Sequence, residues 1–167
     1  MGELSVERTA IDGLLIVHLP VLTDSRGWFK ENWQRAKMLP LGLPDFAPVQ
    51  ENVSHNVEAG VTRGFHAEPW DKYASVACGK VFGAWVDLRE GAGFGTLVTT
   101  EMAPGTAVFV PRGVGNAYQT LDPGTTYSYL VNDHWSPEAR GHYTFVNLAD
   151  ATVACPWPLP LDETKMS

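Results

Sequence analysis

Glycine and proline interrupt this sequence at short intervals, and no other feature limits its fold as strongly. The 167 residues include 16 Gly and 12 Pro without a repeating period, and these residues separate short apolar segments. Proline breaks a helix interior and glycine weakens it. Long helices are therefore excluded, whereas short strands joined by turns are favoured.

The apolar segments predict a series of strands about ten residues apart. The runs Lys72–Cys78 and 80–88 flank Gly79 and predict consecutive strands joined by a tight turn. Further strands are predicted at 14–19, 96–102, 106–110, 117–121 and 126–131. Only residues 32–39 and 137–140 are candidates for a helix, of one or two turns each. We predict one all-β domain, residues 1–167, of the jelly-roll type.

Composition limits the partners. The chain is 44% hydrophobic, which suits a packed core, and its net charge is −7 with a pI of about 5.1. General nucleic-acid binding through a basic face is therefore not expected, although a few converging Arg and Lys could bind a small anion. No apolar run approaches the ~20 residues of a transmembrane helix, and the N-terminus lacks a secretory pattern. We expect a cytoplasmic protein without membrane contact.

Metal and nucleophile chemistry find little support. The chain has two cysteines and five histidines and no His-x-His pair, so we expect neither a disulfide framework nor a metal site, and no cofactor. The Gly-x-Ser-x-Gly nucleophile elbow of serine hydrolases is also missing. Cys78 lies in an apolar strand, where core packing is its expected role.

The segment 60–70 (G-V-T-R-G-F-H-A-E-P-W) gathers groups that could do acid–base chemistry. On a regular strand Arg63 and Phe65 would share one face, and Gly64 and His66 the other. A lone histidine on a strand is more often structural than catalytic, and an isolated lysine such as Lys72 is usually solvated. These residues alone therefore leave the function open.

Short motifs follow one another along the rest of the chain. They are D-x-R-G-x-F-x-E at 24–31, Q-x-N-x-S at 50–54, R-G-F-H at 63–66, Lys72, V-D-L-R at 86–89, P-x-G at 111–113, Tyr129, S-P at 136–137, Asp150 and W-P at 157–158. Their joint order and spacing, over residues 20 to 158, resemble the dTDP-4-dehydrorhamnose 3,5-epimerase family.

The resemblance implies a cupin-like jelly-roll β-barrel, a homodimer and a metal-free reaction. It implies that C3 and C5 of a dTDP-4-keto-6-deoxy sugar are inverted by proton removal beside the ketone and proton return on the other face. In this assignment His66 is the base, Asp150 its carboxylate partner, and Tyr129 the acid. Lys72 would stabilise the charge on the enolate oxygen.

The resemblance also assigns the nucleotide contacts. The segment that binds the thymidine part, which this family takes from the partner subunit, corresponds to Arg26, Phe29 and Glu31. Nucleotide and diphosphate contacts correspond to Gln50, Asn52 and Arg63. An arginine suits a diphosphate because its planar fork donates two hydrogen bonds at once.

The chain departs from the family pattern at three places. His66 and Lys72 are only six residues apart, which is several fewer than usual. Asn116 stands in place of a pocket histidine and is expected to bind the sugar, since an amide can hydrogen-bond but cannot take up a proton at neutral pH. His55 stands where an arginine is common. Similar short members are joined to a reductase, so a reductase domain or partner is a further expectation.

Three functions stay open at this point. The first is epimerisation at C3 and C5, or at one of them, for rhamnose or for another deoxysugar. The second is a ketoisomerase on the same scaffold, which would also need a histidine base. The third is a non-catalytic module that binds a sugar nucleotide and assists a partner enzyme.

Overall fold

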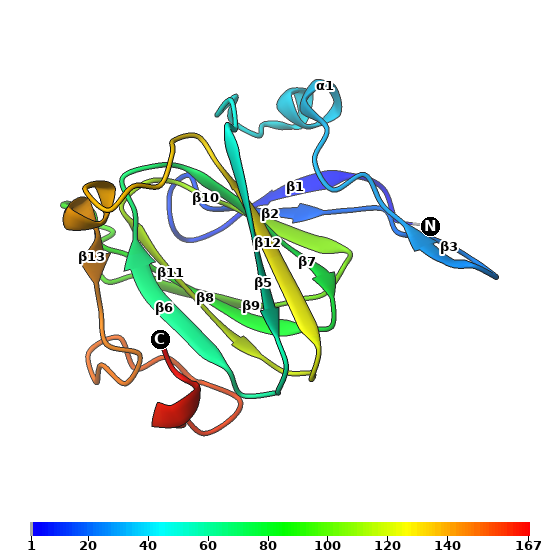
Figure 1. Cartoon of the computed structure of the whole chain (residues 1–167). Helices are drawn as coiled ribbons and strands as arrows, with labels where there is room; N and C mark the ends of the chain where they lie inside the picture. Colours follow the sequence, from blue (N-terminus) through cyan, green and yellow to red (C-terminus); the bar gives the residue numbers. More distant parts are fainter. Residues whose placement is uncertain (1) are drawn as a thin grey trace.

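The computed structural model describes residues 2–167, and two antiparallel sheets form its body (Figure 1). The larger sheet has the order β1 (Ser5–Arg8), β2 (Leu15–His18), β10 (Thr106–Val110), β7 (Lys72–Cys78), β12 (Thr125–Val131) and β5 (Gln50–Asn56). The smaller sheet has the order β13 (Thr144–Phe145), β6 (Thr62–Ala67), β11 (Val114–Thr120), β8 (Val81–Asp87) and β9 (Leu97–Met102). The predicted all-β class is confirmed.

Helical segments are short, as the glycine and proline content predicts. The predicted helix at 32–39 is reduced to α1 (Arg35–Met38), which continues into the 3-10 turn η1 (Leu39–Leu41). The segment expected at 137–140 forms the 3-10 turn η2 (Ala139–His142), and η3 (Glu163–Lys165) lies near the C-terminus. Within residues 2–167 no helix is long and apolar enough to span a bilayer.

The turn at Gly79 joins the two sheets. The strands β7 and β8 are consecutive, as predicted, but β7 pairs with β10 and β12 in the larger sheet while β8 pairs with β11 and β9 in the smaller one. Gly79 has φ of +77°, and a Cβ there would lie 2.3 Å from the Thr125 hydroxyl oxygen. The sharp crossing therefore requires glycine.

Side chains from both sheets fill the space between them. This central core includes Val76, Trp85, Val108 and Tyr127. Further apolar layers cover the outer faces. Residues around α1 pack on the larger sheet, and the segment 146–166 packs on the smaller one, for example through Trp157 against Phe65. Because both faces of the sheets are covered, strands such as β7 are apolar along most of their length.

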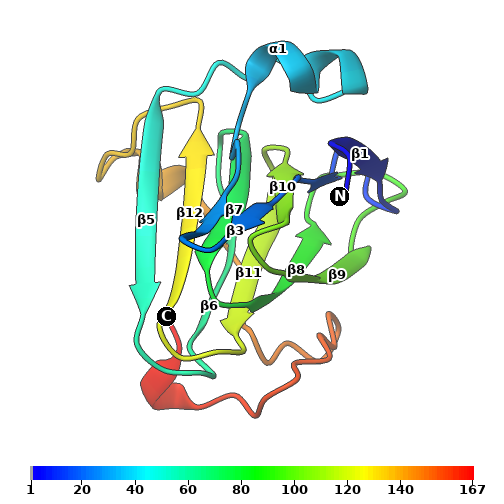
Figure 2. The same cartoon turned by 90° about the vertical axis from the view of Figure 1, so that its right-hand side faces the viewer.

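A hairpin projects from this body. It consists of β3 (Leu22–Asp24) and β4 (Gly27–Phe29), which pair only with each other. Figure 1 shows it extending to one side of the larger sheet, and Figure 2 shows α1 above the sheets. Two large apolar side chains on the hairpin, Trp28 and Phe29, are 47% and 62% exposed.

Candidate active site

A cavity of about 200 Å³ opens between the two sheets, and β5, β6, β7, β11 and β12 all supply residues to its wall. It brings together five of the residues expected from the sequence: Arg63, His66, Lys72, Asn116 and Tyr129. His66 comes from the smaller sheet, whereas Lys72 and Tyr129 come from the larger one. Groups from two opposite walls can therefore act on one bound molecule.

A bulge in β6 brings Arg63 into this cavity. Strict alternation predicts Arg63 and His66 on opposite faces of the strand, and this is wrong. His66 pairs with Asn116 and Arg63 pairs with Tyr118. Between these two pairs β6 therefore has one residue more than β11, which is a β-bulge. Gly64, with φ of +111°, lies in the bulge, and a Cβ there would come within 2.3 Å of the Asn116 carbonyl oxygen.

The half-buried His66 is held in its neutral form. Burial lowers its pKa below the ordinary 6.5, and the positive charge of Lys72 lowers it further. Glu68 acts in the opposite direction, and Arg140 adds to the lowering. Its ring lies edge-on to Phe145, with 5.1 Å between centroids. A neutral imidazole near pH 7 can accept a proton.

Tyr129 is held in its protonated form. Burial is the main reason that its pKa rises to about 12, and the negative charge of Glu68 raises it further. The Lys72 ammonium nitrogen lies 4.6 Å from the centroid of the Tyr129 ring. The cavity thus contains a neutral base, a protonated phenol and an ammonium cation.

Glu68 is the residue that the sequence interpretation left without a role. Its carboxylate forms an ion pair with Lys72 at 2.8 Å between Oε2 and Nζ, and both side chains are over 90% buried. The Trp70 indole N–H donates to the same oxygen at 2.8 Å. A signal was present in the sequence, because a glutamate stands four residues before the lysine and two after the histidine.

Asn116 has a fixed orientation. Its Oδ1 accepts hydrogen bonds from Trp85 Nε1 at 2.8 Å and from the Tyr127 hydroxyl at 3.4 Å. An indole N–H can only donate, so the amide oxygen must face Trp85 and the amide nitrogen must face away from it. The side chain is buried, yet lines the cavity. Asn116 therefore offers a donor to whatever occupies the cavity.

The match to known proteins extends over nearly the whole chain. The family model described as dTDP-4-dehydrorhamnose 3,5-epimerase matches residues 8–167. The chain belongs to this family. Membership confirms the predicted enzyme class, an epimerase of the dTDP-sugar type.

Individual members of the epimerase family support this. The RmlC homolog of Streptococcus pyogenes serotype M6 is 51% identical over 152 residues, covering 88% of this chain and 77% of that protein. The structure of RmlC from Streptococcus suis in complex with dTDP-D-xylose has a TM-score of 0.91 at 48% identity, covering 98% of this chain and 89% of that one. RmlC from Legionella pneumophila, in complex with dTDP-4-keto-L-rhamnose, has a TM-score of 0.86 at 26% identity, covering 99% and 88%. These likenesses confirm the cupin-like jelly roll.

The structure does not bring Asp150, the expected partner of the epimerase base, to His66. Asp150 lies in the loop that follows β13, where its Oδ1 accepts the backbone N–H groups of Val153 at 3.0 Å and Thr152 at 2.8 Å. These two bonds lower its pKa below the ordinary 3.8. Asp150 thus caps a turn, and the acidic side chain that acts on His66 is Glu68.

The expected thymidine segment also lies outside the cavity of its own chain. Arg26 is on the projecting hairpin and pairs with Asp24 at 2.5 Å, and Phe29 is on the same hairpin. Glu31 pairs with Lys37 at the start of the helical region. Donation of this segment to a partner subunit therefore stays a prediction.

Gln50 and Asn52, the two nucleotide contacts expected on β5, lie on this edge strand and do not line the cavity. Gln50 donates from Nε2 to Asn52 Oδ1 at 2.9 Å, and its Oε1 accepts the backbone N–H of Trp135 at 3.0 Å. A second hollow of about 370 Å³ is lined by residues that include His55 and Lys165, and it shares Arg63 with the cavity. Arg63 thus connects the cavity with this hollow, in which Lys165 is paired with Glu58 at 2.6 Å.

Further cavity residues were not anticipated from the sequence. Ser54, Tyr118 and Tyr127 belong to this group, and the two tyrosine rings are stacked with 4.2 Å between centroids. Only the pairing of β11 with β6 and β8 and of β12 with β5 and β7 places them there. Residues 2–167 contain no group of three or more His, Cys, Asp or Glu that could hold a metal ion.

Proposed function

We propose that this chain inverts C3 and C5 of a dTDP-4-keto-6-deoxyhexose, as a step of dTDP-rhamnose synthesis. The observation that carries the proposal is a neutral His66 and a protonated Tyr129 on opposite walls of one cavity, beside the Lys72 ammonium. The family and its ligand complexes with dTDP-D-xylose and dTDP-4-keto-L-rhamnose support this choice of substrate.

The chemistry follows from the properties of the three groups. His66 removes the hydrogen beside the C4 ketone as a proton, and the C–H electron pair moves into an enolate. The Lys72 ammonium stabilises the negative charge that develops on the enolate oxygen. Tyr129 then gives its proton to the same carbon from the opposite face, which inverts the centre. Loss of a proton from His66 and uptake of one by Tyr129 restore both groups.

The remaining residues around the cavity contact the sugar nucleotide. Asn116 donates from its amide nitrogen to an acceptor on the sugar, since its oxygen is already used by Trp85. Arg63 lines both the cavity and the second hollow and can donate to the diphosphate, whereas Lys165 in that hollow is already paired with Glu58 at 2.6 Å. Gln50 and Asn52 contribute to the nucleotide contacts at the edge of β5.

A homodimer completes the proposal. Arg26 and Phe29 lie on a hairpin that projects from the body and exposes large apolar side chains, with Glu31 just after it. A second copy that covers this hairpin would receive these residues at its own nucleotide site.

Solvent exchange tests the reaction. The protein is incubated with dTDP-4-keto-6-deoxyglucose in heavy water, and the C3 and C5 proton signals are followed by NMR. We expect both signals to disappear and the inverted sugar to form. Loss of one signal would replace double epimerisation by a single-position epimerase. Exchange without inversion would favour a ketoisomerase, and binding without exchange would favour the non-catalytic module.

A matched pair of histidine variants tests the base. His66→Ala should slow exchange by roughly 10²–10⁴-fold, the usual contribution of general acid–base catalysis, and should leave dTDP binding nearly unchanged. His18→Ala is the control, because His18 is exposed and pairs with Glu7 on the outer strands β1 and β2. Equal loss in both variants would overturn the role of His66.

A further inference from the structure

Glu68 is the one acidic residue that lines the cavity within the described chain. Its side chain is 9% exposed and that of Lys72 is 6% exposed. Burying a carboxylate is costly unless a charge and hydrogen bonds compensate it. Here a single oxygen, Oε2, contacts both the Lys72 ammonium and the Trp70 indole N–H, each at 2.8 Å.

This arrangement fixes where the Lys72 ammonium lies. On one side it contacts Glu68, and the face of the Tyr129 ring lies 4.6 Å away. No second hydrogen-bond acceptor for Lys72 Nζ occurs among residues 2–167, although an ammonium has three donors. The uncommitted donors are therefore available to a ligand in the cavity.

We propose that Glu68 is a positioning residue of the reaction, which holds the Lys72 ammonium beside Tyr129 and balances its charge so that His66 can take up a proton and Tyr129 keeps its proton until the sugar carbon receives it. This inference rests on the proposed function. Glu68 acts through Lys72, His66 and Tyr129 and exchanges no proton with the substrate.

The charges around the two proton-transfer groups agree with this role. Three charged groups act on His66: Lys72 from β7 and Arg140 from η2 lower its pKa, and Glu68 raises it. Around Tyr129, Glu68 and Tyr118 raise the pKa and Arg63 lowers it, while Lys72 lies against the ring. Glu68 is thus the only one of these groups that raises the pKa of both residues.

Glu68→Gln tests the inference, because it removes the charge and keeps the shape. Without the carboxylate the pKa values of His66 and Tyr129 both fall, so both limbs of the pH profile of kcat/KM should move to lower pH. Near neutral pH we expect kcat/KM to fall roughly tenfold to a hundredfold, which is less than the ~10²–10⁴-fold contributed by a group that itself transfers the proton. Glu101→Gln is the matched control, since Glu101 is exposed and forms a long surface ion pair, with 3.7 Å between its Oε2 and Lys80 Nζ. A uniform loss of activity with an unmoved profile would overturn the proposal.

A second readout does not depend on turnover. The ring signals of His66, assigned by their loss in His66→Ala, are titrated by NMR in the ligand-free protein. We expect the His66 pKa to fall in Glu68→Gln and to return towards the wild-type value in Glu68→Gln/Lys72→Gln, because two opposite charges are then removed together. An unmoved His66 titration in the single variant, or no return in the double variant, would overturn the inference. If wild-type protein shows no exchange of the sugar protons, the proposed function fails, and the NMR titration still decides whether Glu68 sets the charge of His66.

Discussion

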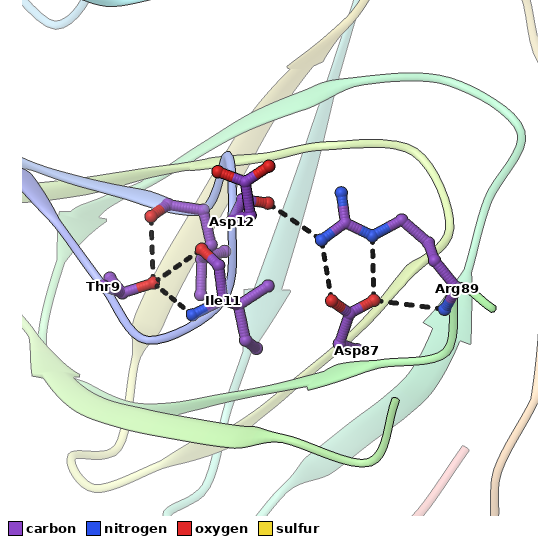
Figure 3. A network of polar contacts seen from close by, with 6 residues as sticks. Thr9, Ile11, Asp12, Asp87 and Arg89 are labelled. Carbon is purple, nitrogen blue, oxygen red and sulfur yellow. Dashed lines mark hydrogen bonds and ion pairs between the residues drawn. The ribbon is translucent and has the colours of Figure 1, made fainter. Parts of the chain in front are cut away.

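Two ion pairs with a buried carboxylate differ in how completely their polar atoms are used. In the pair Asp87–Arg89, Asp87 Oδ1 accepts from the Arg89 backbone N–H at 3.1 Å and from Nε at 2.8 Å, and Oδ2 accepts from Nη2 at 2.7 Å. The same Nη2 donates to the Asp12 carbonyl oxygen at 2.8 Å and so ties down the loop between β1 and β2 (Figure 3).

The pair Glu68–Lys72 is incomplete by the same measure. One carboxylate oxygen contacts one ammonium, and within residues 2–167 neither Glu68 Oε1 nor a second Lys72 donor has a polar partner. Neither is a fully buried atom without a partner, since among the described residues only Asn32 Oδ1 and Trp33 Nε1 are in that state. Both atoms belong to the wall of the cavity, and a ligand is the natural partner. The closed pair stabilises the fold, and the open pair is available for chemistry.

The sharpest test of this contrast is Lys72→Gln. It removes the charge that would stabilise the enolate, and kcat/KM should fall by about 10²–10³-fold, or about 2.7–4 kcal/mol, as when one oxyanion donor is lost. The melting temperature should fall as well, because the Glu68 carboxylate is left buried without a cation, so kcat/KM is compared per folded molecule. Steady-state kinetics and calorimetry measure the two quantities, with Lys80→Gln as the control on an exposed turn. A variant that unfolds but stays fully active per folded molecule would place Lys72 with Arg89 as a structural residue.

In Asn116 the amide oxygen is already bonded to Trp85, whereas the amide nitrogen is available to a ligand. The variant Asn116→Asp tests the two atoms separately. An aspartate oxygen still accepts from Trp85, but the atom that faces the cavity changes from a donor to an acceptor. We expect kcat/KM to fall by roughly one to two orders of magnitude, or about 1.4–2.7 kcal/mol. Kinetics measure this, and the near-ultraviolet dichroism of the buried Trp85 should be retained. An unchanged kcat/KM would show that Asn116 does not bind the sugar.

The contrast also explains how far the sequence could predict the structure. Strand positions follow local patterns of apolar residues and turns, and segments such as 72–78 and 106–110 are correct within a residue. The partners of a strand depend on the whole chain, so the crossing at Gly79 and the bulge at Gly64 could not be predicted locally.

The site shows the same division. His66, Lys72 and Tyr129 carry distinctive chemistry in a recognisable order, and the fold brings them together. Asp150 matched by spacing, yet two adjacent backbone N–H groups orient its carboxylate locally. Glu68 resembles a solvated surface acid in the sequence, and only the packing of Trp70 and Lys72 around it shows its burial.

The smallest expected effect lies at the closed pair and concerns stability. In Asp87→Asn an amide NH₂ faces Arg89 Nη2, so two donors oppose each other where a charged pair stood. Breaking a buried pair costs about 3–5 kcal/mol, but the Arg89 side chain is 34% exposed. We therefore expect a loss of about 2 kcal/mol, which lowers the melting temperature by roughly 4–8 °C.

The pH dependence of this loss identifies its cause. The hydrogen bonds from Arg89 lower the pKa of Asp87 below the ordinary 3.8 in the folded state. A lowered pKa means that the carboxylate stabilises the fold fully above 3.8 and loses this contribution as the pH falls through the folded value. The difference in the free energy of unfolding between wild type and Asp87→Asn should therefore shrink in acid, as measured by denaturant titration at several pH values. Turnover per folded molecule should be unchanged, because Asp87 lies outside the cavity. A constant difference across this range, or a loss of turnover, would contradict the assignment of the closed pair to stability alone.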